Sequence, residues 1–284
     1  MTSARNTLPR RFAGLALTRS LLMGIVNVTP DSFSDGGDFA RVEDAIAHGR
    51  RLIEDGADIV DIGGESTRPG SAPTAVADEL ARVEPVVAAL AKSGALVSID
   101  TRRAAVMRSA IAAGARIVND VSALTADAES LGIVAASGVS VVLMHMQGEP
   151  ATMQQGPHYR DAPAEIAGFL RARVDACRAA GIPDERIAID PGIGFGKTVE
   201  HNLQLLAHLD RFTALGVAVL VGLSRKGFIA RLSRGEPPKA RDPGSIAGAL
   251  AAAQGGADIL RVHDVAGTRQ ALAVWQAIQS HRSS

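Results

Sequence analysis

Ten polar residues stand where short apolar segments of the chain end, and their side chains are of types that bind ligands or do chemistry. In chain order they are Asn27, Asp61, Asp100, Asn119, His145, Asp190, Ser224, Lys226, Arg261 and His263. Asp100, Asn119 and Asp190 offer hydrogen-bond acceptors, and the amide of Asn119 can also donate. This combination suits the edge of a flat heterocycle that carries amidine-like or guanidine-like N–H donors. The acidic and amide residues therefore predict a heterocycle-binding site.

The basic residues predict a second half of the same site. Arg68, Arg261 and His263 are cationic donors of the kind that bind phosphate or diphosphate. Asn27 precedes an acidic loop and could help to place Mg²⁺, which prefers oxygen ligands and keeps some of its water. We therefore expect a flat, donor-rich ring to bind beside a diphosphate.

The segment of residues 187–198, IAIDPGIGFGKT, has the features of a strand that ends in a ligand-binding loop. The β-branched residues before Asp190 favour a strand, and the proline and glycines after it prevent a regular continuation. Two nucleotide-binding motifs are excluded, because Pro191 replaces the first glycine of a Walker A loop and Lys197 replaces a glycine of the dinucleotide fingerprint. A solvated loop lysine is the expectation for Lys197.

Several of these residues also have simpler interpretations. Asp61 could bond only the backbone amides of its own loop, and His145 could be a core histidine. Asp100 and Asn119 are of types that cap helices. Arg261 could form a structural ion pair with Asp264. So many polar residues at the ends of separate segments nevertheless favour one shared site.

The elements that must position these residues follow a regular alternation. Apolar runs occupy residues 21–28, 59–62, 96–99, 116–118, 139–144, 187–189, 217–223 and 258–260, and segments with helical spacing lie between them. Glycines just before several runs, as in Gly56 and Gly114, suit helix C-caps. Polar residues gather after the runs, where a (β/α)₈ barrel has its active-site loops. We predict an α/β fold, a single TIM barrel, over a doubly wound open sheet with one switch point.

Composition supports a single large domain of 284 residues, 46% of them hydrophobic. We expect residues 1–20 to form an N-terminal extension or hairpin and residues 21–284 to form the barrel domain. The formal net charge is zero, which gives no reason to expect nucleic-acid or membrane partners. The single cysteine, Cys177, excludes an internal disulfide and a cysteine-based zinc cluster. Since the first 20 residues lack the apolar core of a secretory signal, the expected location is the cytoplasm.

Two long motifs carry a resemblance to a known family. Residues 23–37, MGIVNVTPDSFSDGG, and residues 61–70, DIGGESTRPG, resemble the two signatures of the dihydropteroate synthase family. Shorter matches follow in the family's order, at residues 98–101, 119–120, 143–148, 190–197, 222–227 and 261–265. The resemblance spans about residues 21–265.

The resemblance implies an activity, a metal and a set of site residues. Members of the family join 6-hydroxymethyl-7,8-dihydropterin diphosphate to 4-aminobenzoate and release diphosphate, with Mg²⁺, in folate biosynthesis, and sulfonamides target them. The implied pterin-binding residues are Asp100, Asn119, Met144, Asp190 and Lys226. The implied diphosphate-binding residues are Asn27, Thr67, Arg68, Arg261 and His263, with Asn27 also at the metal. The implied aminobenzoate site contains Phe33, Pro69, Phe195 and Ser224, and the implied catalytic residues are Arg68, Lys226, Arg261 and His263.

The family's route is dissociative: diphosphate leaves first and the arylamine traps a pterin cation. A homodimer is also implied, and an apolar helix at residues 271–279 could serve as its interface. Three alternatives stay open: a pterin-dependent methyltransferase of the same barrel family, a Schiff-base aldolase that uses Lys226, and a pterin-binding protein without activity. The basic residues implied at the diphosphate count against the methyltransferase, which has no use for them.

Overall fold

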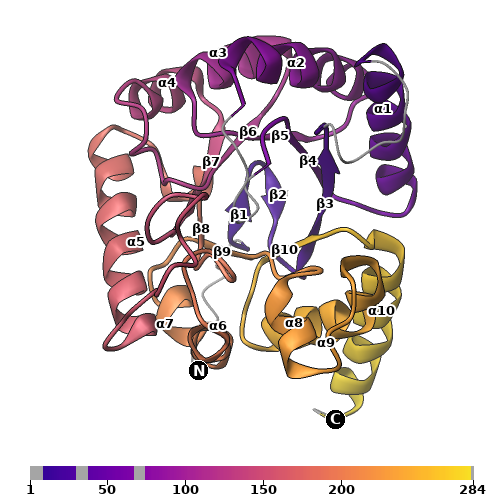
Figure 1. Cartoon of the computed structure of the whole chain (residues 1–284), viewed down its shortest axis with the longest axis vertical. Helices are drawn as coiled ribbons and strands as arrows, with labels where there is room; N and C mark the ends of the chain where they lie inside the picture. Colours follow the sequence, from indigo (N-terminus) through magenta and orange to yellow (C-terminus); the bar gives the residue numbers. More distant parts are fainter. Residues whose placement is uncertain (1–8, 30–37, 67–73, 283–284) are drawn as a thin grey trace, which may run out of the picture.

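The computed structural model describes residues 9–29, 38–66 and 74–282. Its central feature is a closed barrel of parallel strands in the order β10-β3-β4-β5-β6-β7-β8-β9 (Figure 1). The strands are Leu21–Asn27 (β3), Ile59–Gly63 (β4), Val97–Asp100 (β5), Ile117–Asp120 (β6), Ser140–Met144 (β7), Ile187–Asp190 (β8), Ala218–Val221 (β9) and Ile259–Val262 (β10). Pairing of Ile259 with Leu21 closes the ring. The predicted (β/α)₈ barrel is confirmed, and each strand coincides with one of the predicted apolar runs.

Helices connect the strands and cover the outside of the barrel (Figure 1). They are Asp38–Glu54 (α1), Val76–Lys92 (α2), Ala104–Ala113 (α3), Ser130–Ser137 (α4), Ala162–Ala179 (α5), Val199–Ala207 (α6), Asp210–Thr213 (α7), Gly227–Leu232 (α8), Asp242–Gln254 (α9) and Val265–Arg282 (α10). Gly114 shows why glycine precedes a strand: it ends α3 with φ of 116°, a left-handed conformation that other residues avoid. Among the described residues, none of the helices has the length and apolar character needed to cross a membrane.

Successive residues of each strand point alternately outward and inward. The outward side chains, such as Val60 and Val118, pack with the helices in the larger hydrophobic cluster. The inward side chains form a separate apolar layer near the amino ends of the strands. That layer contains Leu21, Met23, Ile59, Ile117, Val142, Ala188, Ala218, Leu220 and Ile259. Because both faces are covered, the strands read as continuous apolar runs rather than alternating ones.

A short antiparallel pair, Arg11–Phe12 (β1) and Leu15–Ala16 (β2), precedes the barrel. Phe12 is fully buried and belongs to the inward apolar layer, so this pair closes the barrel at the amino ends of its strands. The Ala13 amide donates to the carbonyl oxygen of Glu185 at 3.3 Å, which ties the turn to the segment before β8. The polar residues lie at the opposite end of the barrel, where the carboxyl ends of the strands meet.

Candidate active site

The polar side chains of the site occupy the next inward-facing positions of the strands, two residues beyond those of the apolar layer and closer to the carboxyl end of the barrel. In β6 the inward residue after Ile117 is Asn119, and in β8 the inward residue after Ala188 is Asp190. The same two-residue step leads from Ile259 to Arg261 in β10. Since inward positions recur every second residue, the strand geometry alone converges these side chains at the carboxyl end of the barrel.

Arg261 is the centre of this polar layer. Its Nε donates to Asp61 Oδ2 at 2.6 Å, and its Nη2 donates to Asp100 Oδ2 at 2.8 Å. Asn119 Nδ2 donates to the same Asp61 oxygen at 3.0 Å. Side chains from β4 and β5 therefore hold the guanidinium plane in one orientation, and Asn119 of β6 holds Asp61 in turn.

This network corrects two interpretations drawn from the sequence. Arg261 pairs with Asp61 and Asp100 instead of Asp264, whose carboxylate accepts from the amide of Gly267. Asp61 bonds side chains from other strands and is fully buried, so it is not a residue that only binds its own loop. Among the described residues its buried Oδ1 has no hydrogen-bond partner, which leaves one oxygen of this carboxylate without compensation.

Burial shapes the charges of the two flanking carboxylates. Burial raises the pKa of Asp100 to about 7, and the charge of Arg261 opposes that shift. Burial also raises the pKa of Asp190, with the nearby ammonium of Lys226 opposing it. A ligand that supplies N–H donors therefore stabilises both carboxylates in their ionised form.

Two glycines keep space between these charged groups. A Cβ at Gly222 would lie 3.5 Å from Arg261 Cβ and 3.9 Å from Asp190 Oδ2. A Cβ at Gly63 would lie 3.8 Å from both Asn27 Oδ1 and Asp100 Oδ2. Each glycine thus leaves open a gap that any larger residue would fill, and each gap is bordered by oxygens suited to a polar ligand.

Asp190 and Lys226 define the next part of the site. Asp190 Oδ1 accepts from the amide of Gly192 at 2.7 Å. The Lys226 amine donates to the carbonyl oxygen of Ile193 and lies 4.3 Å from the centre of the Phe195 ring. Burial lowers the pKa of Lys226 to about 7, although Asp190 opposes the change. The structure therefore brings Lys226, implied at the pterin, against Phe195, implied at the aminobenzoate.

Ser224 and His263 also meet. The amide of His263 lies 3.2 Å from Ser224 Oγ and donates to it, and His263 Nδ1 lies 3.0 Å from the same oxygen. With Oγ accepting from the amide, its own proton can go to Nδ1, and the ring then carries its proton on Nε2. That tautomer presents an N–H donor, as phosphate binding requires.

The remaining implied residues divide into two groups. Met144 ends β7, is 3% exposed and pairs in register with Asp190, which puts it at the same rim. Asn27 ends β3 and is half-buried there. The residues Phe33, Thr67, Arg68 and Pro69 lie outside the described residues.

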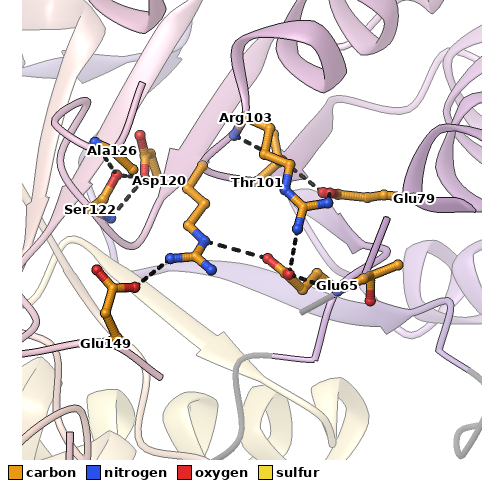
Figure 2. A network of polar contacts seen from close by, with 10 residues as sticks. Glu65, Glu79, Thr101, Arg103, Asp120, Ser122, Ala126 and Glu149 are labelled. Atoms are coloured by element: carbon orange, nitrogen blue, oxygen red, sulfur yellow. Dashed lines mark hydrogen bonds and ion pairs between the residues drawn. The ribbon is translucent and has the colours of Figure 1, made fainter. Parts of the chain in front are cut away.

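A second polar network, which the sequence did not predict, lies beside the site (Figure 2). Glu65 Oε1 accepts from the amide of Thr74 at 3.1 Å and from Arg103 Nη2 at 2.8 Å. Arg103 Nη1 donates to Glu79 Oε2 at 2.8 Å, and Thr101 Oγ1 donates to Glu79 Oε1 at 2.7 Å. The bond between Glu65 and the amide of Thr74 thus joins the described residues that precede and follow residues 67–73.

The expectation for Lys197 was wrong. The side chain is 2% exposed, and its amine lies 3.1 Å from Nδ1 of His145, which is itself buried. Burial lowers the pKa of His145 to about 3, which keeps its ring neutral and supports the core-histidine interpretation. A lysine in a loop of glycines and apolar residues was the only signal in the sequence for this pair.

Comparisons with known proteins agree with this geometry. The family model described as "Pterin binding enzyme" matches residues 23–263. A dihydropteroate synthase of Neisseria meningitidis serogroup C is 46% identical over 93% of this chain and 94% of the relative.

Solved structures give the same result. The Xanthomonas albilineans dihydropteroate synthase with 4-aminobenzoic acid is 54% identical, with a TM-score of 0.90 over 96% of this chain and 99% of the other. The enzyme from the same organism in complex with 7,8-dihydropteroate has a TM-score of 0.85 at 52% identity, over 93% and 95%. The Yersinia pestis dihydropteroate synthase in complex with a sulfonamide drug has a TM-score of 0.88 at 45% identity, over 94% and 96%. Fold, site and these similarities agree that the chain belongs to the pterin-binding enzymes, and among them to the dihydropteroate synthase family.

Proposed function

We propose that the chain condenses 6-hydroxymethyl-7,8-dihydropterin diphosphate with 4-aminobenzoate to give 7,8-dihydropteroate and diphosphate, a step of folate biosynthesis. The observation that carries the proposal is the layer in which Arg261 is shared by Asp61 and Asp100, beside Asn119 and Asp190. It combines acceptors for a donor-rich ring with a cation, as the reaction requires. Relatives that bind 4-aminobenzoic acid and 7,8-dihydropteroate support the same conclusion.

The pterin lies, in this proposal, within the polar layer. Asp190, Asp100 and Asn119 face the donor edge of the ring, and Met144 packs on its apolar face. Lys226 lies near the ring carbonyl and N5, where an amine with a pKa of about 7 can hold or release a proton.

The diphosphate is assigned to the basic side of the rim. Arg261 and His263 supply its donors, and Thr67, Arg68 and Asn27 complete the set. Charge-assisted hydrogen bonds to a dianionic leaving group strengthen as its negative charge develops, so these donors favour the transition state over the ground state.

A Mg²⁺ ion fits this arrangement through one protein oxygen. Within the described residues, no three His, Cys, Asp or Glu side chains are grouped to hold a metal. Asn27 Oδ1 borders the gap at Gly63 together with an oxygen of Asp100. A Mg²⁺ held by Asn27, by water and by the diphosphate itself would neutralise charge on the leaving group, in keeping with the usual Mg²⁺ ligands.

The residues assigned to the pterin and the diphosphate favour a dissociative reaction. Loss of diphosphate leaves a cation that the electron-rich dihydropterin can delocalise. The arylamine nitrogen then attacks the exocyclic carbon and releases one proton to give the secondary amine of the product. No strong protein nucleophile is needed, and the neutral, buried His145 is not placed to act as a base. The protein contributes orientation, electrostatic stabilisation and exclusion of the water that would otherwise capture the cation.

Phe195 and Ser224, with Phe33 and Pro69, form the proposed aminobenzoate site. Sulfonamide binding at this site is part of the proposal, supported by the complex of the Yersinia pestis relative with a sulfonamide drug. The direct test of the whole proposal is to incubate the protein with dihydropterin diphosphate, labelled 4-aminobenzoate and Mg²⁺. Labelled dihydropteroate is expected, and a correctly folded protein that forms none would refute the proposal.

The methyltransferase alternative is not favoured, since the similar proteins are dihydropteroate synthases and the basic rim has no role in methyl transfer. Replacement of Arg261 by alanine distinguishes the two activities. Arg261→Ala should weaken binding of the diphosphate substrate far more than binding of a pterin without phosphates, measured by titration calorimetry. Equal losses for the two ligands would argue against a diphosphate at Arg261.

A homodimer and a cytoplasmic location complete the proposal. On α10, Val274 and Ile278 are 58% and 52% exposed, and a second copy could cover these two apolar side chains. Light scattering after gel filtration measures the molar mass in solution, which for a homodimer is that of two chains.

The proposed cytoplasmic location has one supporting observation. A buried free cysteine, Cys177, is in keeping with a reducing compartment.

A further inference from the structure

The amine of Lys197 is enclosed by three acceptors. It lies 3.1 Å from His145 Nδ1, and it donates to the carbonyl oxygens of His145 at 3.3 Å and of Phe195 at 2.9 Å. The charged ammonium has three N–H donors, one for each acceptor, and the neutral amine still has two. Packing alone does not explain this choice, because an apolar side chain of similar length would fill the space without the cost of burying an amine.

The three acceptors belong to two different parts of the chain. His145 follows the last residue of β7, whereas Phe195 lies in the loop of residues 191–198 after β8. In that loop Gly192, Gly194 and Gly196 all have positive φ angles, of 71°, 82° and 61°, and Asn202 Oδ1 accepts from the amide of Gly194 at 2.7 Å. Lys197 therefore ties a glycine-rich loop to the end of a neighbouring strand.

The same loop also contacts Lys226, a residue of the candidate active site. Lys226 donates to the carbonyl oxygen of Ile193, and its amine lies 4.3 Å from the centre of the Phe195 ring. Lys197 thus forms a hydrogen bond with the backbone carbonyl of Phe195, while Lys226 contacts the Phe195 ring. We propose that Lys197 is a positioning residue, whose amine fixes the loop so that the Phe195 ring keeps its place for the second substrate.

The protonation states of the pair agree with this role. The pKa of His145 is lowered to about 3 by burial, so its ring stays neutral and Nδ1 is able to accept. A further hydrogen bond supports the loop on the same inner side, since Tyr159 Oη donates to the carbonyl oxygen of Gly196 at 3.0 Å. That the second substrate is 4-aminobenzoate rests on the proposed function.

The test compares Lys197→Met, which keeps the length of the side chain and removes its donors, with Lys239→Met, an exposed lysine of the 3₁₀ helix Pro238–Arg241. With saturating dihydropterin diphosphate, Lys197→Met should raise the KM for 4-aminobenzoate about tenfold or more, because small displacements of a positioning group have large effects. The dissociation constant of 6-hydroxymethylpterin should stay within about twofold of the wild-type value, since the loop that Lys197 fixes contacts the other substrate. Lys239→Met should leave both values unchanged.

Amide hydrogen exchange gives a readout that does not need activity. Lys197→Met should speed exchange of the amides of residues 192–197 about tenfold or more relative to the rest of the barrel, because a local opening becomes easier. If the wild type makes no dihydropteroate, the proposed function fails while the exchange result still decides the bracing role. Unchanged exchange in a folded variant, or an unchanged KM in an active one, would overturn the inference.

A second variant covers the case in which Lys197→Met does not fold. Tyr159→Phe removes only the hydroxyl that donates to Gly196 and leaves the ring in place. The same rise in KM for 4-aminobenzoate is expected, smaller in size, with unaltered pterin binding. No change in either KM or loop exchange would count against a role of this inner hydrogen bonding in placing Phe195.

Discussion

At the scale of single residues, the site is organised by one arginine shared between two carboxylates. Asp61 is fully buried, the Asp100 side chain is 14% exposed, and Arg261 is the cation that both contact. One positive charge cannot neutralise two negative ones, so the layer as a whole favours ligands that bring N–H donors. A pterin edge is such a ligand, and the uncompensated Asp61 Oδ1 shows where acceptor capacity is left over.

Asp190 is the residue for which this reasoning makes the simplest prediction. Asp190→Asn replaces a carboxylate by a neutral amide, half of which is a donor that would face the donors of the pterin. The loss of pterin affinity should be about 2 kcal/mol or more, as expected for hydrogen bonds to a charged group. Titration calorimetry with a pterin that lacks the diphosphate measures it, and near-normal affinity would mean that Asp190 does not bind that edge.

Lys197 makes a prediction about pH. Burial lowers the pKa of Lys197 to about 7, below its ordinary value of 10.5. Above pH 7 the folded protein has therefore lost this proton while the unfolded chain still binds it, so unfolding takes up a proton and the free energy of unfolding rises with pH. The rise is at most about 1.4 kcal/mol per pH unit between pH 7 and 10.

Other buried groups titrate in the same range, so the comparison must be made with Lys197→Met. The difference in free energy of unfolding, wild type minus variant, should increase with pH over this window. Urea denaturation at several pH values gives that difference. A difference that is flat or falls with pH would show that the amine is charged in the folded state throughout.

The local sequence identified most of the polar rim but not its partners. Asp100, Asn119, Asp190 and Arg261 were recognisable because each stands at the end of an apolar run. Their pairing was not, since Arg261 is 200 residues from Asp61 and only the closed barrel brings the two together. Lys197 was misjudged for the same reason, because its burial depends on His145, which follows a different strand.

At the scale of elements, the strands were predictable and the shortest helices were not. Each strand is buried on both faces and therefore leaves a continuous apolar run in the sequence. The helices α7 and α8 have 4 and 6 residues, less than two turns, so no apolar periodicity could reveal them. The network around Glu65 was also missed, because its members come from separate loops and α2.

That network leads to a prediction about stability. Arg103 contacts Glu79, whose side chain is only 1% exposed and whose carboxyl pKa is raised by burial. Arg103→Met would leave this carboxylate without its cation, and the free energy of unfolding should fall by about 3 kcal/mol. Urea denaturation measures the change.

Arg108, on α3, offers a control with an exposed partner. The side chain of its partner, Glu129, is 64% exposed, so solvent already weakens the pair. Arg108→Met should cost about 1 kcal/mol or less. Equal losses for the two arginines would mean that burial of the carboxylate does not decide the stability of this network.

At the scale of the whole molecule, the barrel is closed at one end and functional at the other. Phe12 completes the apolar layer at the amino ends of the strands, and the polar layer begins one inward step beyond it. The sequence predicted the barrel because the alternation repeats along the entire chain. It could not predict that a residue of the N-terminal segment fills the barrel, because nothing local marks Phe12 as internal.

Phe12→Ala tests the closing role. Removal of a fully buried phenylalanine should lower the free energy of unfolding by about 3–5 kcal/mol, through lost contacts and the cavity that remains. Since Phe12 lies at the end of the barrel away from the site, kcat and KM of the folded variant should change little. A loss of activity without a loss of stability would contradict this division.

The two-layer interior has a consequence for how such a barrel changes over generations. The lower layer is apolar and self-contained, so a strand keeps its place whatever residue occupies the next inward position. A population of such proteins can therefore explore new ligands by exchanging only the uppermost inward residue of a strand and the loop that follows it. Selection for a new substrate and selection for a folded chain then act on different residues of the same strand.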